Sequence, residues 1–363
     1  MKITLLGRYG EGDIEAGPEK VARNLYEQIA KLNPDTEFIT YFFKVTKKRQ
    51  LKQLLFGSET VSSNQNIHRL GILKLIIVLI KNRPDLVHIV TFERFELLVL
   101  FLKSILRFKL VYTIHGIYRH ERKIFYKKPS IFSDLKDLLL EKLLLSYSDS
   151  LIFLSPQMIQ LAENYYYFDR HMTSIIPNGV SVPEFSIEKS FDISKSIEIV
   201  FYNGLDSSRK RGLEDLIMIL SELRMDIFHL SVFGSAINTE YARVNFFNPL
   251  PEPSLFKFLN DKHIFIDNFN YMPFSILALE TLALGLILIV SDESGISSYI
   301  KNGENGFVYD SKRPNEIRKI LLDIAGGKHS LEIISKNAII TAKDLSWDKI
   351  AKQYFTNYQE MFK

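Results

Sequence analysis

Short apolar runs alternate with longer amphipathic segments through the first half of the chain. Runs rich in β-branched side chains predict strands, whereas apolar positions that recur every three or four residues predict helices. The predicted strands are Lys2–Gly7, Glu37–Phe43, Leu86–Val90, Leu110–Ile114, Leu151–Leu154 and Ser174–Ile176. The predicted helices are Pro18–Leu32, Ile67–Lys81, Arg94–Arg107, Ile131–Tyr147 and Pro156–Tyr166.

The alternation pauses over Pro177–Ser196, which we interpret as a linker because it has turn-forming residues and no sustained period. A second series of strands and helices follows. Its predicted strands are Ile197–Tyr202, Phe228–Phe233, Val244–Phe247, Ile264–Asp267 and Leu286–Ser291. Its predicted helices are Arg211–Leu223, Glu252–Leu259 and Ser275–Leu284, and Asn315–Phe362 is predicted to be mostly helical.

Strands that alternate with helices are typical of parallel sheets with helices on both faces. The pattern therefore predicts an α/β fold with two Rossmann-like domains, residues 1–180 and residues 181–345, followed by a C-terminal helix over residues 346–363. In such sheets ligands bind beyond the carboxyl ends of the strands. With two domains, we expect the site in a cleft between them.

Composition narrows the class of protein. Of the 363 residues, 46% are hydrophobic and 24% are charged, as in ordinary globular proteins, and the lack of cysteine excludes disulfides and thiolate metal sites. The apolar stretches Ile72–Ile80 and Phe95–Leu106 are each interrupted by a lysine, so no membrane-spanning helix is predicted. The short apolar start does not resemble a signal peptide, and we expect a cytoplasmic protein.

Charge is unevenly distributed along the chain. Residues 1–180 contain 26 basic and 18 acidic side chains, whereas residues 181–363 contain 20 and 24. The basic first half suggests an anionic partner there. The segments Lys44–Phe56 and Tyr118–Lys128 mix basic and bulky apolar residues, as in a segment that lies on an anionic membrane, although a solvated helix face fits equally well. Nothing beyond mild basicity points to nucleic acid.

Two places in the first half are candidates for ligand contact. The loop from Gly7 to Gly17 opens the first helix, where glycines and free N–H groups favour an anion, but its spacing is not that of a dinucleotide fingerprint, and a surface loop is the alternative. His115 and Gly116 directly follow a strand, so His115 either contacts a ligand or braces the loop. His88, inside a strand, is expected to be structural.

Two anomalies stand out in the second half. Asn203–Gly212 is a loop between strand and helix with three consecutive basic residues, Arg209, Lys210 and Arg211, which suit a diphosphate or form a solvated turn. Glu280 is the only charge in a long apolar stretch. A buried carboxylate needs donors, either ribose hydroxyls or an arginine from another element. Nucleophile-elbow, zinc-protease and D-x-D motifs are missing from the sequence.

Taken in order, these pieces resemble the retaining glycosyltransferases of family 4, also called group 1, from residue 1 to about residue 310. The matching segments are Ala16-Gly17-Pro18-Glu19, Thr113-Ile114-His115-Gly116, Ser148–Ser155, Ile176–Val180, Gly204–Gly212, Leu279–Gly285 and Asn302–Phe307. The resemblance implies a GT-B fold, in which residues 1–180 face the acceptor, residues 181–345 bind the nucleotide sugar, and residues 346–363 pack back on the first domain.

The resemblance also implies roles for individual residues. The two catalytic positions would be Gly17 and His115. Gly17 would approach the donor diphosphate and the acceptor, and His115 would touch the transferred sugar. Donor-binding residues would be Gly204, Arg209, Lys210, Arg211, Ser275, Ile276, Leu277 and Glu280, with Glu280 on the ribose and the basic loop neutralising the leaving group without a metal. Met272, Pro273 and Phe274 would lie near the sugar.

Three positions depart from the family pattern. The first glutamate of the E-x7-E pair is replaced by Met272, the arginine after the loop glycine is replaced by Leu205, and the glycine doublet is reduced to Gly17. These departures leave open a non-catalytic subunit that stabilises a partner transferase, and a nucleotide-sugar epimerase is a further rival.

The leading expectation is a metal-independent, retaining transferase with no cofactor. It would move a hexose-type sugar from a UDP- or GDP-sugar to a glycan or lipid-linked acceptor in surface polysaccharide biosynthesis. The basic first half would contact that acceptor and the inner face of a membrane, as a peripheral protein.

Overall fold

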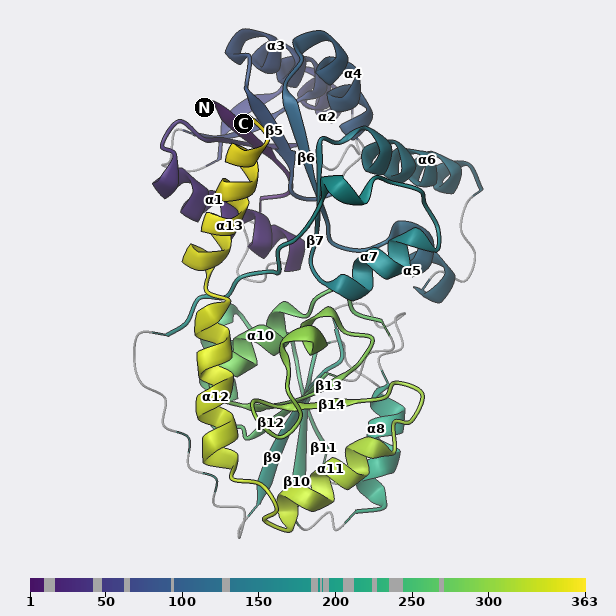
Figure 1. The fold of residues 1–363 in the computed structure, drawn as a ribbon, viewed down its shortest axis with the longest axis vertical. Coiled ribbons are helices and arrows are strands. Elements are labelled where there is room, and N and C mark those ends of the chain that lie inside the picture. Colours follow the sequence, from purple (N-terminus) through teal and green to yellow (C-terminus); the bar gives the residue numbers. More distant parts are fainter. Residues whose placement is uncertain are drawn as a thin grey trace. The chain divides into compact units, whose positions relative to one another are not determined.

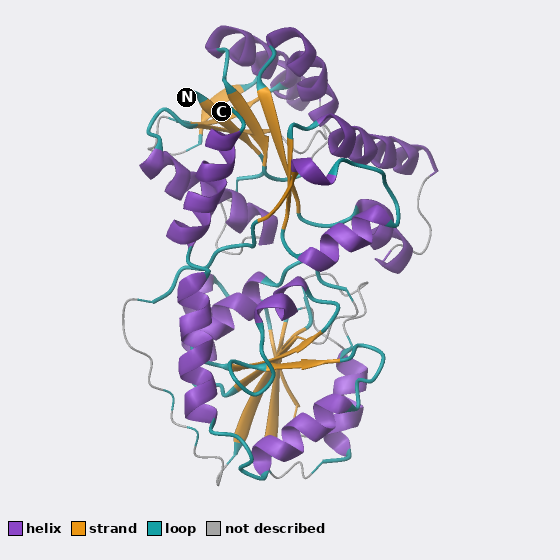
Figure 2. Ribbon diagram, in the orientation of Figure 1, coloured by secondary structure: helices purple, strands orange, loops and turns teal. Residues whose placement is uncertain are grey.

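The computed structural model describes residues 1–9, 17–41, 48–61, 66–92, 95–125, 131–183, 189, 191, 196–204, 212–223, 227–234, 244–267 and 271–363. The chain folds into two compact units. Unit 1 contains Met1–Pro177 together with Trp347–Lys363, and unit 2 contains Asn178–Ser346. Helices and strands alternate in both units (Figure 2).

Unit 1 is built on an eight-stranded sheet with the order β3-β4-β2-β1-β5-β6-β7-β8, in which only β3 runs antiparallel to its neighbour. Its strands are β1 (Ile3–Leu6), β2 (Glu37–Tyr41), β3 (Ser58–Thr60), β4 (Ile67–Leu70), β5 (Leu86–Ile89), β6 (Lys109–Ile114), β7 (Ser150–Phe153) and β8 (Thr173–Ile175). The central strands β1, β5, β6 and β7 are buried along nearly their whole length, as expected for parallel strands covered on both faces.

The helices of unit 1 cover both faces of this sheet (Figure 1). They are α1 (Gly17–Leu32), α2 (Lys48–Phe56), α3 (Ile72–Asn82), α4 (Glu96–Leu106), α5 (Tyr118–Phe125), α6 (Ile131–Tyr147), α7 (Pro156–Glu163) and α13 (Trp347–Glu360), with a 3₁₀ turn η1 (Arg170–Met172). Helix α13, from the far end of the sequence, packs against α1.

A buried polar network ties α13 to the sheet. The two ring nitrogens of His88 on β5 contact the hydroxyl of Tyr358 at 2.6 Å and that of Thr113 at 2.8 Å. The side chain of Asn357 links Ser150 on β7 to Ser174 on β8, at 3.0 and 2.9 Å. The structural role expected for His88 is therefore confirmed.

Unit 2 contains a fully parallel six-stranded sheet with the order β11-β10-β9-β12-β13-β14. Its strands are β9 (Ile197–Tyr202), β10 (Phe228–Phe233), β11 (Val244–Phe247), β12 (Ile264–Asp267), β13 (Ile287–Ser291) and β14 (Phe307–Tyr309). Its helices are α8 (Leu213–Ser221), α9 (Glu252–Asn260), α10 (Ile276–Ala283), α11 (Glu316–Ala325) and α12 (Leu331–Asp344), with a 3₁₀ turn η2 (Gly295–Tyr299).

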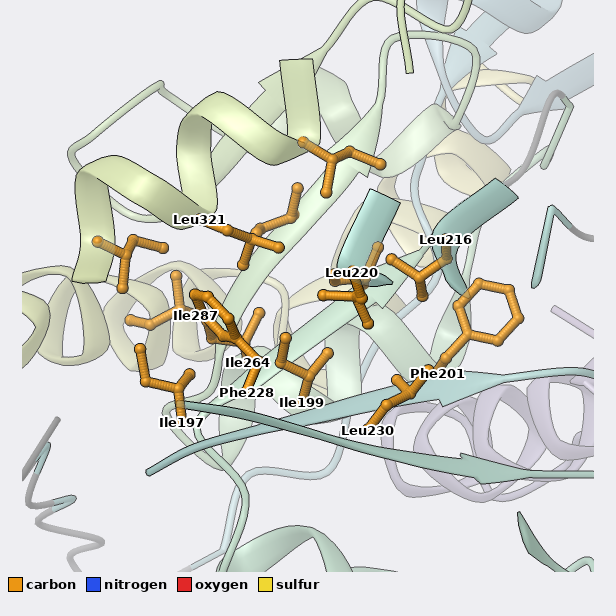
Figure 3. Packing of buried hydrophobic residues seen from close by; sticks show 14 of the residues in the cluster. Ile197, Ile199, Phe201, Leu216, Leu220, Phe228, Leu230, Ile264, Ile287 and Leu321 are labelled. Carbon is orange, nitrogen blue, oxygen red and sulfur yellow. The ribbon is translucent and has the colours of Figure 1, made fainter. Parts of the chain in front are cut away.

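The core of unit 2 lies between this sheet and the helices α8 and α11. Ile199, Phe201 and Leu230 from the strands meet Leu216 and Leu220 from α8 (Figure 3). Side chains alternate along each strand, so the opposite face is left for α10 and α12, which pack against each other. Burial of this kind contributes about 1.5–3 kcal/mol for each large apolar side chain and holds the strand ends in place.

The chain passes between the units twice, and the two crossings are joined by backbone contacts. The amide of Val180, which follows the first crossing, donates to the carbonyl of Leu345 at 3.0 Å, and Val180 also forms a parallel bridge with Ser346. Asn178–Val180 and the last residues of unit 2 are therefore joined to each other within unit 2.

Most predicted elements are present, but the helix predicted over Ile67–Lys81 is wrong in its first turn. Ile67–Leu70 is strand β4, paired with β2 and β3, and the helix begins only at Ile72. Gly71 separates the strand from the helix. Glycine is required there, because a Cβ would lie 2.6 Å from the carbonyl oxygen of Gln53 in α2. The pattern also missed β3 and β14, whereas α2 and α5 lie in the two segments for which a solvated helix face was one of two interpretations.

Candidate active site

In unit 1 the order of the sheet reverses between β1 and β5. The chain proceeds from β1 to β2 on one side, and returns to β5 on the other side of β1. Ligands of parallel α/β sheets bind beyond the carboxyl ends of the strands at such a reversal. Gly7 and the start of α1 at Gly17 follow β1, Val90 and Thr91 follow β5, and His115 follows β6. The sheet thus brings Gly17 and His115 to the same edge of unit 1.

His115 braces this edge through one ring nitrogen only. Its side chain hydrogen-bonds the backbone of Val90, the residue after β5, whereas its Nε2 is buried with no hydrogen-bond partner among the described residues. Burial lowers the pKa of His115 to about 4, although the hydrogen bond to Val90 opposes that shift. Because that bond favours the protonated ring, its acceptor is the Val90 carbonyl, which leaves Nε2 of the neutral ring as an acceptor.

The segment after His115 is held by a buried carboxylate. Glu141 on α6 accepts hydrogen bonds from the backbone amides of Tyr118 at 2.6 Å and Arg119 at 3.2 Å, at the start of α5. The hydroxyl of Tyr166 donates to the same carboxylate at 2.5 Å. Burial raises the pKa of Glu141, and these three donors oppose that shift. Glu141 therefore fixes the loop that carries His115, a role that the sequence pattern did not reveal.

In unit 2 the reversal lies between β9 and β12. Asn203 and Gly204 follow β9, and Tyr271–Ser275 precede α10 after β12. Gly204 has a φ of +73°, and Gly234, after β10, has a φ of +121°. A Cβ on Gly234 would lie 2.4 Å from the carbonyl oxygen of Gly204, so glycine is required where the two loops meet.

The predicted phosphate loop begins at this point. Arg209, Lys210 and Arg211 lie outside the described residues, and so does Leu205. The loop ends at Gly212, which has a φ of +79° and precedes the first turn of α8. Both ends of the basic segment are thus glycines in the left-handed region, and Gly204 lies at the reversal of the sheet.

The start of α10 lies at the same edge of unit 2. The hydroxyl of Ser275 accepts a hydrogen bond from the amide of Ala278 at 3.2 Å and caps the helix. Ile276 and Leu277 form its first turn and are half-buried. Glu280, on the next turn, is 6% exposed, so its predicted burial is confirmed. Its contact with a ribose remains a prediction.

Met272 is held beside the end of β13. It forms a parallel bridge with Ser294, and its carbonyl accepts a hydrogen bond from the amide of Gly295 at 2.9 Å. The hydroxyl of Ser294 is buried with no partner among the described residues. Phe274 packs edge-on against Tyr299, with ring centroids 6.1 Å apart, and Pro273 is half-buried. Ser294 is itself fully buried, and the sequence pattern did not single it out.

The segment Asn302–Phe307, which matched the family pattern, is a structural turn. The side chain of Asn305 accepts from the amide of Lys301 and donates to Tyr299 and Thr341, while Asn302 accepts from the amide of Val308. The side chains of both asparagines therefore hydrogen-bond within unit 2 and stabilise its fold, and we assign them no role in the reaction.

The described residues contain no group of three or more His, Cys, Asp or Glu side chains placed to hold a metal ion. No helix in the described part of the chain is both long and apolar enough to cross a membrane. Of the two segments predicted to suit a membrane surface, Lys44–Phe56 is described from Lys48 as α2 and Tyr118–Lys128 as far as Phe125 as α5.

Comparisons with known proteins agree with this architecture. The family model for Glycosyltransferase Family 4 matches residues 16–183, and the family model for Glycosyl transferases group 1 matches residues 198–340. No curated protein matches the sequence. Among solved structures, the chain is similar to sucrose-phosphate synthase from Thermosynechococcus elongatus, with a TM-score of 0.75 and 18% identity over 99% of this chain and 98% of that one.

Two further structures resemble the chain. The lipopolysaccharide outer core galactosyltransferase WaaB has a TM-score of 0.72 and 16% identity, and 99% of each chain is covered. HepE from Anabaena, solved in complex with UDP-glucose, has a TM-score of 0.68 and 16% identity over 99% of this chain and 100% of that one. The predicted GT-B fold is confirmed, and the chain belongs to the group 1 glycosyltransferases of family 4.

Proposed function

We propose that the chain transfers a hexose-type sugar, with retention and without a metal, from a UDP- or GDP-sugar to a glycan or lipid-linked acceptor in surface polysaccharide biosynthesis. The observation that carries this proposal is the unpaired, buried Nε2 of His115 at the ligand-binding edge of unit 1, which has no partner among the described residues. A neutral ring with a free acceptor suits a sugar hydroxyl, which is a donor.

The groups at the corresponding edge of unit 2 suit the nucleotide. The first turn of α10 offers backbone N–H groups and the positive end of the helix dipole to a phosphate. The buried carboxylate of Glu280 suits the vicinal hydroxyls of a ribose. The basic loop at Arg209, Lys210 and Arg211 would neutralise the charge that develops on the diphosphate.

These groups support a same-face transfer. The bond between the anomeric carbon and the diphosphate oxygen breaks while the acceptor oxygen bonds the anomeric carbon from the same side. The acceptor's proton passes to the departing diphosphate. With a pKa of about 4, His115 orients the sugar as a neutral ring and is not the proton donor at neutral pH.

Similar proteins support the donor and acceptor classes. HepE was solved with UDP and with UDP-glucose, and WaaB is a galactosyltransferase of the lipopolysaccharide outer core. We therefore propose a UDP-sugar before a GDP-sugar as the donor, and a surface glycan as the acceptor.

A second candidate is a non-catalytic subunit that stabilises a partner transferase. Met272 favours it, because an uncharged thioether is only a weak acceptor and replaces the glutamate that contacts the donor sugar in the family. In this case the chain would co-purify with a transferase that has the complete E-x7-E pair.

The experiment that separates the two is a thermal-shift series with UDP, GDP, ADP and dTDP and their sugar conjugates. A ligand at about 100 times its dissociation constant adds about 2.7 kcal/mol of stability and raises the melting temperature. A shift with UDP or GDP, followed by release of that nucleotide on adding an acceptor, supports transfer. If no nucleotide raises the melting temperature, the transferase proposal is wrong and the subunit candidate replaces it.

A further inference from the structure

Three helices of unit 1 direct apolar side chains away from its core. Helices α3 and α4 are apolar around most of their circumference, so each has an exposed apolar stripe in addition to its buried one. Ile77 is 54% exposed, Phe101 is 62% exposed and Leu135, on α6, is 66% exposed. Ile80, Ile105 and Leu139 extend these stripes by one further turn on each helix.

The three helices cover the same face of the sheet. The crossovers β4-α3-β5, β5-α4-β6 and β6-α6-β7 all move across the sheet in one direction, and crossovers between parallel strands are right-handed, so their helices lie on one side. The β1-α1-β2 crossover moves in the opposite direction, which places α1, with its neighbour α13, on the other side. Helices α4 and α6 contact each other.

The exposed charged side chains that the structure describes on these three helices are of one sign. Among the described side chains of α3, α4 and α6 and the residue that ends α4, every exposed charge is basic: Lys74, Lys81, Arg107, Lys136 and Lys142. The acidic side chains that the structure describes on these helices, Glu96, Asp137 and Glu141, are buried. By contrast, α12 in unit 2 exposes both Glu332 and Lys336.

A hollow of about 620 Å³ opens between α4 and α6 on this face. Its wall is apolar. Its rim carries three cations and one carboxylate, Asp149, which pairs with Lys103 at 3.0 Å and with Lys109 at 3.9 Å, so the rim has a net positive charge. The wall includes Leu97, Leu100 and Leu143, and the rim cations are Lys103, Arg107 and Lys109. The hollow lies where β6 and β7 begin, at the opposite end of these strands from His115. It is therefore separate from the ligand-binding edge of unit 1.

We infer that the face formed by α3, α4 and α6, here called the apolar–basic face, docks on a membrane that contains anionic phospholipids. Its apolar side chains enter the interface, its lysines and arginine meet lipid phosphates, and the hollow takes up part of one lipid. A second copy of this chain fits less well, because a two-fold contact would place lysines opposite lysines. The inference goes beyond the proposed function, which names no membrane contact, and rests on that function for its biological setting.

The test is co-sedimentation of the full chain with vesicles of phosphatidylcholine alone and of phosphatidylcholine with phosphatidylglycerol. The variant Ile77→Asp with Phe101→Asp removes the apolar stripes, and Lys81→Glu with Arg107→Glu reverses the charge. The control Ile333→Asp with Ile340→Asp changes two exposed isoleucines of α12 in the same way. We expect binding only to anionic vesicles, reduced about tenfold or more in both test variants and unchanged in the control.

Several results would overturn the inference. Wild-type protein that binds neither vesicle, or a double Asp variant that binds as wild type does, would do so. So would a wild-type dimer that the Ile77→Asp, Phe101→Asp variant converts to a monomer, because the face would then join two copies. All substitutions are at exposed positions, and circular dichroism checks the fold. The nucleotide thermal shift of the same variants tests the donor site independently, so failure of lipid binding and failure of the proposed function are distinguished.

Discussion

Two histidines of unit 1, His88 on β5 and His115 directly after the neighbouring strand β6, differ in how completely their ring nitrogens are hydrogen-bonded. His88 uses both ring nitrogens, on Tyr358 and Thr113, whereas His115 uses one and leaves Nε2 buried without a partner among the described residues. A buried polar atom without a partner costs about 1–3 kcal/mol. That cost is recovered when a ligand supplies the missing donor, and this separates a structural histidine from one that serves a substrate.

We expect His115→Phe to lower kcat about tenfold to a hundredfold while nucleotide binding stays within a factor of two. The substitution keeps a ring of similar size but removes the acceptor, a loss equivalent to about 1–3 kcal/mol in the transition state. Initial rates and nucleotide titration measure the two effects. Because the pKa of His115 is about 4, the rate should show no ionisation of this ring between pH 6 and pH 9. His171→Phe, on η1, is the control, and equal losses in both variants would contradict the assignment.

Glu280 gives a prediction about the nucleotide. Glu280→Gln should weaken nucleotide binding by about 1–3 kcal/mol, because an amide replaces a charged acceptor of ribose hydroxyls. The sharper measurement compares the nucleotide with its 2′-deoxy form in calorimetric titrations of both proteins. Wild type should prefer the ribose, and the variant should lose most of that preference. If Glu280→Gln keeps the preference for the ribose, Glu280 does not contact the ribose. The control Glu332→Gln, on α12, should keep the wild-type preference.

The sequence was informative about residues whose signals are local. His115 stands directly after a strand, and Glu280 is a lone charge in an apolar stretch, so position and isolation were sufficient to select them. Ser294 and Glu141 carried no such signal. Whether a serine hydroxyl lacks a partner, or a glutamate caps a distant helix, depends on neighbours that only the folded chain supplies.

At the scale of elements, long apolar or strongly periodic segments were predictable and short edge strands were not. Ile67 and Leu70 are three residues apart, a spacing that fits a helix, and the apolar run from Ile72 extended the helical pattern backwards. Strand β4 forms because β2 and β3 provide partners on both sides. Pairing between segments distant in sequence overrode the local pattern.

The contact between β5 and α13 predicts a loss of stability in acid. Burial lowers the pKa of His88 from 6.5 to about 3, and the neighbouring His115 contributes to the shift. The unfolded chain therefore binds the proton first as the pH falls. The stability provided by neutral His88 is present above pH 6.5 and is lost as the pH falls towards 3, with about 1.5 kcal/mol lost between pH 6.5 and pH 5.

Urea unfolding between pH 5 and pH 7.5 measures this loss. In wild type, the free energy of unfolding should fall with pH in part because one more proton binds to the unfolded chain at His88. In His88→Gln, which cannot titrate at this position, that part of the slope should be lost. Proton NMR of the wild-type ring should show it neutral down to about pH 4. A ring that titrates near pH 6.5 in the folded protein would contradict the prediction.

At the scale of the whole molecule, unit 1 is completed by a segment that follows all of unit 2 in the sequence. Helix α13 buries Trp347, Ile350, Ala351, Tyr354 and Tyr358 in unit 1. The helical pattern of this segment was evident in the sequence, but its place of packing came only from the family resemblance. Amphipathic periodicity identifies the apolar face of a helix and not the surface that covers it.

Removal of residues 347–363 should therefore destabilise unit 1 selectively. The loss of four large buried side chains corresponds to about 5 kcal/mol or more in the free energy of unfolding of unit 1. Scanning calorimetry should show one transition at a lower temperature and one unchanged, with limited proteolysis attacking residues 1–177 first. Equal displacement of both transitions would contradict the division into units. The control is Ile333→Asp with Ile340→Asp on α12, a change confined to unit 2, which should leave the transition of unit 1 unchanged.

The same division sets an order of events during synthesis. A ribosome makes residues 1–177 first, then all of unit 2, and only afterwards the segment that contributes Tyr354 and Tyr358 to the surroundings of His88. Domains usually fold in the order in which they emerge. Here unit 2 is complete before unit 1, because unit 1 also needs Trp347–Lys363. The face of unit 1 that α13 covers is therefore exposed until the end of synthesis. We expect chaperones to bind that apolar face until α13 covers it.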